Sequence, residues 1–143
     1  MSTSKADASR PVRSLDELEE SGLSELLASI ERGLPATLLN ALQERLDLEP
    51  QEMASLLGIS SRTLERRREK GALTSVESER LYRLVRLFRK AVNVFENEEE
   101  ARRWLKRPQM RLGEQVPLEI ARLEPGAREA ERLLGRIEHG IPA

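Results

Sequence analysis

Residues 50–71 read PQEMASLLGISSRTLERRREKG, and this stretch decides the fold. A proline that can open a helix stands first, and Gly58 and Gly71 can each end one. Ser60 or Ser61 can cap the second helix, because a serine hydroxyl accepts a hydrogen bond from an N–H group of the first turn. The stretch therefore predicts two short helices joined by a tight turn at Gly58.

The spacing within this stretch is that of a helix-turn-helix motif. Such a motif needs a small residue where the second helix packs on the first, and Ala54 has that position. Four residues later it needs a turn residue that tolerates positive φ, which Gly58 supplies. Arg67 departs from the pattern, because the second helix commonly has another apolar residue there. The apolar contacts around the turn would come from Met53, Leu57, Ile59 and Leu64.

The second helix carries the side chains that we predict to contact DNA. Its first turn is rich in Ser, Arg and Thr, which can reach base edges in the major groove. The Arg and Lys residues further along the helix can reach phosphates. The alternative interpretation is a solvated basic helix in an ordinary bundle. The predicted DNA-contact residues are Ser60, Ser61, Arg62, Thr63, Arg66, Arg67 and Lys70.

The distribution of charge favours the DNA interpretation, although the net charge of the whole chain is only −1. Residues 1–50 hold five basic and ten acidic side chains, whereas residues 62–90 hold ten basic and four acidic ones. The second segment therefore has a net charge of +6. Attraction to phosphate depends on the local field, so this asymmetry is more informative than the total.

The composition predicts a helical fold throughout. Apolar residues make up 38% of the 143 residues and aromatic residues only 3%, so the core must be mainly aliphatic. Together with abundant Arg and Glu, an aliphatic core favours helices over strands. Helices are expected from about Leu15 to Arg32, after Pro35, after Asn97, and from Pro125 to about Glu138. A longer helix is expected to begin at a capping box formed by Thr74 and Glu77. It continues through an apolar stripe at Leu81, Leu84, Phe88, Ala91 and Phe95.

Three basic residues, Arg83, Arg86 and Lys90, are expected on the side of the long helix opposite the stripe. They either extend the basic surface or form a solvated face that Glu77 and Glu79 balance. The solvated face is the favoured interpretation.

The residues also exclude several classes of function. The chain has no Cys, which rules out disulfides and thiolate metal sites and fits a reducing cytoplasm. No apolar run approaches the ~20 residues that span a bilayer. Residues 1–13 lack the apolar core of a signal peptide, and we expect them to be disordered. His139 is the only His. The sequence shows neither the pattern of a catalytic triad nor a phosphate-binding glycine loop. We therefore expect no metal, no cofactor, no membrane contact and no enzymatic activity.

The last forty residues predict a compact helical module without catalytic groups. Trp104, the only Trp, would be a core anchor or an interface hot spot. In the tail, Gly135 and Gly140 would let the backbone approach another surface closely. A DNA-reading helix pair joined to such a module suggests a regulator that also binds a protein.

Two ordered sets of residues carry a resemblance to a known family. The first set is Leu56 to Ser60, Arg62 to Leu64, Arg67, Gly71 and Glu77 to Leu81, and the second is Ala101, Trp104, Leu105, Pro108, Leu112, Gly113, Pro117, Leu118, Gly126, Ala127 and Leu134 to Gly140. Over about residues 38–143 the chain resembles the antitoxins of the Xre/MbcA/ParS type, which pair with RES-domain toxins. Leu123 departs from the family, which often has Thr there, and so does Ala130, where a larger β-branched residue is common.

The resemblance implies an all-α fold with an Xre-like helix-turn-helix domain (residues 14–90) and a small helical toxin-binding domain (residues 91–143). It implies a bacterial type II antitoxin that represses its own operon by binding the operator DNA. The second domain would occlude the active site of a toxin that consumes NAD, with residues 133–143 entering the cleft. The residues expected to contact the toxin are Trp104, Leu105, Leu133, Arg136, Ile137, Glu138, Gly140 and Ile141.

A homodimer is expected, because one recognition helix offers too few contacts for specific affinity. The stripe from Leu81 to Phe95 is one candidate surface, and a higher-order complex with the toxin is also expected. Two other functions stay open on the sequence. One is a stand-alone transcriptional regulator with a C-terminal dimerisation domain. The other is a helical adaptor without a DNA role, which the positive charge of residues 62–90 disfavours.

Overall fold

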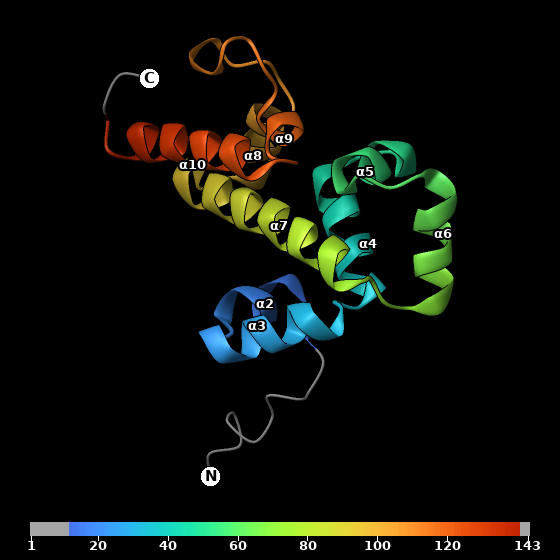
Figure 1. Ribbon diagram of the computed structural model, residues 1–143. Helices are drawn as coiled ribbons and strands as arrows, with labels where there is room; N and C mark the ends of the chain where they lie inside the picture. Colours follow the sequence, from blue (N-terminus) through green and yellow to red (C-terminus); the bar gives the residue numbers. More distant parts are fainter. Residues whose placement is uncertain (1–11, 141–143) are drawn as a thin grey trace. The chain divides into compact units, whose positions relative to one another are not determined.

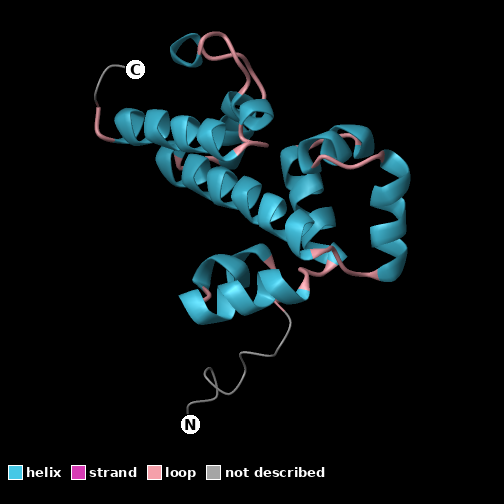
Figure 2. Cartoon of the chain, viewed as in Figure 1, coloured by secondary structure: helices cyan, strands magenta, loops and turns pink. Residues whose placement is uncertain are grey.

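The computed structural model describes residues 12–140, and this part of the chain is built of helices (Figures 1 and 2). Its only β pairing consists of two isolated bridges, Pro35 with Ala72 and Gln109 with Gln115. None of its helices has the length and hydropathy that a membrane span requires. The all-α prediction is therefore confirmed. Residues 1–11, which make up most of the segment that we predicted to be disordered, lie outside the described residues. Ile141, one of the predicted toxin contacts, also lies outside them.

The chain divides into two compact units, residues 1–82 and 83–143, and the division falls inside one helix. Unit 1 contains α2 (Leu15–Glu20), α3 (Leu23–Arg32), α4 (Ala36–Leu46), α5 (Pro50–Leu57), α6 (Ser61–Lys70) and the start of α7 (Ser75–Phe95). Unit 2 contains the rest of α7, α8 (Glu98–Leu105), the short 3-10 helix η2 (Met110–Leu112), α9 (Pro117–Ile120) and α10 (Glu124–Glu138).

The single helix expected over residues 15–32 is wrong, because the chain forms α2 and α3 with a break between them. At the break Ser21 is extended, with ψ of 142°, and its hydroxyl donates to the carbonyl of Glu17 at 2.8 Å. Gly22 then begins α3, and its N–H donates to Oε1 of Glu25 at 3.3 Å. Apolar residues keep a helical spacing across the break, so periodicity alone does not reveal it.

Helix α4 supplies the centre of the aliphatic core of unit 1. Its four leucines, Leu38, Leu39, Leu42 and Leu46, have no exposed surface. Burying each such side chain contributes about 1.5–3 kcal/mol. The other fully buried side chains of this unit include Met53, Leu57, Leu64 and Leu81.

The link between α3 and α4 pairs with the link between α6 and α7. The N–H of Leu73 donates to the carbonyl of Leu34 at 2.9 Å, and the N–H of Leu34 donates to Oγ of Ser78 at 2.7 Å. Glycine is required at position 33, where φ is +100°, because a Cβ there would lie 2.1 Å from the carbonyl oxygen of Leu73. These contacts fix the start of α7 against α4.

The apolar stripe of α7 is confirmed as a buried seam. Leu84, Phe88 and Ala91 have no exposed surface. Phe95 is half-buried, and its ring centroid lies 6.0 Å from that of Trp104 on α8. Because the seam is used inside the chain, it is not a free surface for dimerisation.

The solvated face expected on the other side of α7 is wrong for Arg83 and Arg86. Arg83 is only 8% exposed, and its Nη1 donates to the carbonyl of Arg122 at 2.7 Å. Arg86 pairs with Glu131 of α10, with 2.6 Å between Nε and Oε2. Both therefore tie α7 to α9 and α10. Their partners lie about forty residues along the chain, where local spacing cannot indicate them.

Candidate functional site

The pair α5 and α6 has the geometry of the predicted helix-turn-helix (Figure 1). Helix α5 ends at Gly58, which has a φ of +73°, and the N–H of Ile59 donates to the carbonyl of Ala54 at 3.0 Å. Ala54 is buried, as close packing at this position requires, and Leu57 and Leu64 have no exposed surface. The motif is therefore confirmed at the level of the fold.

A residue outside the motif fixes its turn. Arg80 on α7 donates from Nη1 to the carbonyl of Leu57 at 2.9 Å, which satisfies an acceptor at the C-terminal end of α5. A Cβ at Gly58 would lie 2.8 Å from this same nitrogen, so the glycine also makes room for the guanidinium. Sequence reasoning missed Arg80, because nothing in its own neighbourhood points to a partner 23 residues away.

The start of α6 is organised by two hydroxyl groups. Oγ of Ser60 accepts from the N–H of Thr63 at 3.0 Å and donates to Oγ1 of Thr63 at 3.1 Å. Ser60 is thus the N-cap residue, one of the two that the sequence suggested. The following residues, Ser61 and Arg62, are exposed in the first turn.

Three basic side chains share one exposed side of α6. Arg62, Arg66 and Lys70 follow at intervals of four residues, which places them along one side of a helix, and all three are exposed. Among the described residues none of the three has an ion pair. Glu69 is exposed on the same side, so the surface keeps an excess of positive charge but is not uniformly basic. We name Arg62, Arg66 and Lys70 the basic face of α6.

Arg67 points away from this face and pairs with a buried carboxylate. Its Nε and Nη2 donate to Oε1 and Oε2 of Glu77 at 2.7 and 2.9 Å, which is a bidentate pair. Glu77 also completes the predicted capping box of α7, because its Oε1 accepts from the N–H of Thr74 at 3.0 Å. One carboxylate therefore holds the last turns of α6 and the first turn of α7 together.

The protonation of this pair follows from its contacts. Burial of the Glu77 carboxyl by itself raises its pKa, but hydrogen bonds from Arg67 and Thr74 outweigh burial and hold the pKa below its usual value. The hydrogen bond to Glu77 raises the pKa of Arg67. Both groups are consequently charged at neutral pH, and the pair acts as a structural ion pair.

Arg68 is also engaged inside unit 1. Its Nε donates to Oδ1 of Asn40 at 2.9 Å, and it also bonds to Gln43, so it attaches α6 to α4. Its Nη1 reaches Glu65 at 3.0 Å. Among the basic residues of α6, only those of the basic face are left to meet an external anion.

The predicted toxin-contact residues divide by exposure. Leu105 has no exposed surface and Leu133 has 7%, so both belong to the core of unit 2. Trp104 is half-buried beside Phe95. At the C-terminal end of α10 the exposed members of the predicted set are Arg136, Glu138 and Gly140, with Ile137 half-buried; Ile141 lies outside the described residues.

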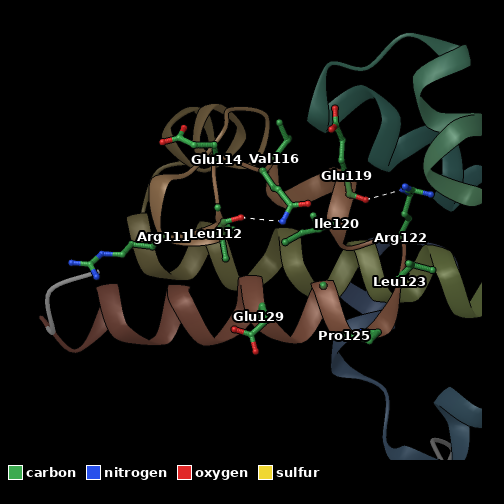
Figure 3. A pocket seen from close by; sticks show the side chains of 13 residues that line it. Arg111, Leu112, Glu114, Val116, Glu119, Ile120, Arg122, Leu123, Pro125 and Glu129 are labelled. Atoms are coloured by element: carbon green, nitrogen blue, oxygen red, sulfur yellow. Dashed lines mark hydrogen bonds between the residues drawn. The ribbon is translucent and has the colours of Figure 1, made fainter.

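Unit 2 also has a groove that sequence reasoning missed. It has a volume of about 840 Å³ and is lined by the loop after η2, by α9 and by the first turns of α10 (Figure 3). Leu123, at the start of α10, is 62% exposed and lines it. Met110, next to its lining residue Arg111, is 78% exposed. The clue in the sequence was Leu123 itself, which departs from the family resemblance.

Comparisons with known proteins match both units. Residues 25–86 match the antitoxin Xre-like helix-turn-helix domain, and residues 90–140 match the antitoxin Xre/MbcA/ParS C-terminal toxin-binding domain. Neither is an enzyme family. The chain is 36% identical to an antitoxin Xre of Photorhabdus laumondii over 81% of this chain and 80% of that protein. It is 35% identical to an antitoxin Xre of Yersinia enterocolitica, with the same coverage.

A third relative is an antitoxin Xre of Pseudomonas putida, which is 33% identical over 81% of this chain and 72% of that protein. A toxin-binding domain is the feature that a stand-alone transcriptional regulator does not need. The match over residues 90–140 therefore favours an antitoxin over that alternative.

The charged state of Glu77 predicts a pH-dependent stability. Glu77→Gln should lower the free energy of unfolding at pH 7 by about 1.5–3 kcal/mol, the usual worth of hydrogen bonds to a charged group. Because the pKa of Glu77 is depressed in the folded chain, the carboxylate stabilises the fold above the ordinary Glu pKa, and this contribution is lost as pH falls through the lowered value. The difference between wild type and variant should therefore shrink in acid.

Urea unfolding followed by circular dichroism at pH 7 and near pH 3 measures this difference. Glu69→Gln is the matched control, because Glu69 is an exposed glutamate of α6 and should change stability little at either pH. A Glu77→Gln effect of equal size at both pH values would contradict the assignment of the pair.

Proposed function

The chain belongs to the Xre/MbcA/ParS family of antitoxins, and on this basis we propose its function. The chain neutralises a RES-domain toxin that consumes NAD, and it represses the operon that encodes both proteins. The toxin carries out the chemistry and handles NAD, so the antitoxin needs no cofactor. It acts in the cytoplasm, where its toxin and its operator are both found.

The basic face of α6 supports the DNA-binding part of the proposal. In a helix-turn-helix the second helix enters the major groove, with the residues of its first turn nearest the base edges. Ser61 and Arg62 have that place here, and both are exposed. Arg66 and Lys70, one and two turns later, meet phosphates. Arg67 has its guanidinium on Glu77, and its role is to position the helix.

The C-terminal end of α10 supports the toxin-binding part. Arg136 and Glu138 are exposed polar side chains, and Ile137 between them is half-buried. Gly140, two residues after the end of α10, has a φ of +73° and open space around the position of a Cβ. A slender end of this kind is suited to enter a cleft in the toxin and occlude it. Ile141 continues this end beyond the described residues.

The antitoxin also acts as a homodimer in this proposal. A single recognition helix contacts only a few base pairs, and dimers gain specificity by reading two half-sites one helical turn apart. With a toxin on each C-terminal domain, the dimer would form a higher-order complex. The seam from Leu81 to Phe95 is buried inside the chain, so another surface must join the two copies.

Light scattering tests the dimer directly. At micromolar concentration the free antitoxin should have a mass of about twice the 16.3 kDa of one chain. On dilution the measured mass should fall toward that of one chain only if the dimer is weak. A mass that stays at 16.3 kDa over the whole range of concentration would overturn this part of the proposal.

Two substitutions test the DNA-binding face. Arg62→Ala should cost ~1–3 kcal/mol of binding to the operator and relax discrimination between sequences, because it removes a base contact. Lys70→Ala should weaken operator and random DNA about equally and lower the slope of affinity against salt by roughly one unit, because it removes a phosphate contact. Fluorescence anisotropy at several salt concentrations measures both effects.

Arg111→Ala is the control for these variants, since Arg111 is an exposed arginine of unit 2 and should leave DNA binding unchanged. If Arg62→Ala and Lys70→Ala affect operator and random DNA alike, the readout of bases does not occur at the start of α6. If wild-type protein binds neither DNA, the helix pair is only a packing unit.

A truncation tests the toxin-binding end. A chain that stops after Gly135 loses Arg136, Ile137 and Glu138 but keeps the buried residues of α10, so it should fold and fail to protect cells. The readout is growth during co-expression with the RES-domain toxin of the neighbouring reading frame, with circular dichroism to establish folding. A chain without residues 1–11 is the control and should protect fully. Full protection by the C-terminal truncation would refute the occlusion model.

A further inference from the structure

The groove of unit 2 presents an apolar residue where local stability favours a polar one. Leu123 is the N-cap residue of α10, with φ of −116° and ψ of 145°, and its side chain makes no capping hydrogen bond. Ser, Thr, Asp and Asn are preferred at this position because they satisfy N–H groups of the first turn. Yet the leucine is 62% exposed, so packing within the chain does not account for it.

The groove is also rigidly built. A Cβ at Gly126 would lie 1.9 Å from the carbonyl oxygen of Ile120, so α10 begins in direct contact with the end of α9. Arg83 holds the link between these two helices through the carbonyl of Arg122. On the opposite wall, the N–H of Gln109 donates to the carbonyl of Gln115 at 3.0 Å and closes the loop. A preformed groove binds a partner without the entropic cost of ordering itself.

The lining combines apolar side chains with charged side chains of both signs. Figure 3 shows Leu112, Ile120 and Leu123 on different walls of the groove. Arg111 and Glu114 lie at its loop side, and Glu129 lies along α10. This chemistry suits an uncharged, apolar side chain with polar neighbours, as at the centre of many protein interfaces.

We propose that the groove takes a large apolar side chain from the surface of the toxin, and that Leu123 determines which toxin is accepted. The inference rests on the proposed function, because its occupant is the same toxin. The segment that matches a toxin-binding domain, residues 90–140, includes the whole groove. The groove is also continuous with the proposed occluding end, since both lie on α10, whose 15 residues span about 22 Å.

A substitution to aspartate separates this role from stability. Leu123→Asp places a preferred N-cap residue at the start of α10, so the variant should melt at the wild-type temperature or higher. At the same time it puts a charge where we propose an apolar contact, and it should weaken toxin binding by about tenfold or more. Affinity for a catalytically inactive RES-domain toxin from the neighbouring reading frame, measured by calorimetry, is the readout.

Val76→Asp is the matched control. Val76 is 58% exposed in the first turn of α7, so it resembles Leu123 in exposure and in its place at a helix start, but it lies outside unit 2. It should bind the toxin as tightly as wild type. Operator binding by Leu123→Asp should also be unchanged.

The outcomes distinguish this inference from the function on which it rests. Equal toxin affinity of wild type and Leu123→Asp overturns the groove as a toxin contact and leaves the antitoxin function standing. If in addition Leu123→Asp changes the mass of the free antitoxin, the groove is an interface between copies of the chain. Failure of the wild-type chain to bind the toxin overturns both the proposed partner and the inference.

Discussion

The carboxylate of Glu77 is the contact on which the DNA-reading unit depends. It accepts two hydrogen bonds from Arg67 and one from the N–H of Thr74, so a single group joins the end of α6 to the beginning of α7. Because α7 also holds the α5–α6 turn through Arg80, the first turns of α7 fix the chain at both ends of the recognition helix. The basic face of α6 is outward because Arg67 is fixed inward.

This partition of the arginines changes the meaning of the net charge. The segment from residue 62 to residue 90 carries a formal charge of +6, which was part of the reason for predicting DNA contacts on α6. However, Arg67, Arg80 and Arg83 all make contacts within their own units. The basic side chains that we propose to contact phosphate and bases are the smaller set on the basic face, which are exposed. Charge counting therefore overstates the charge that is available to a ligand, because several of the counted arginines hold the fold together.

The features that the sequence predicted are those with a local physical cause. The turn at Gly58, the cap at Ser60 and the capping box at Thr74 and Glu77 each depend on residues within four positions of one another. The break at Ser21 was also local, but the continuing apolar spacing concealed it. The contact between Arg83 and Arg122, by contrast, joins residues 39 apart and leaves no periodic trace in the sequence.

Helix α10 departs from local preference at two positions. Leu123 occupies an N-cap position without capping, and Gly135 lies in the helix interior, where glycine costs about 0.5–1 kcal/mol relative to alanine. Apart from the adjoining backbone of α10 and the two flanking residues, no heavy atom of the described residues lies within 4 Å of where a Cβ of residue 135 would be, so internal packing among them does not require the glycine. Sequences tend to break local rules where function demands it. Two such departures on one helix of a toxin-binding domain support a contact surface that extends along α10 from the groove to the C-terminal end.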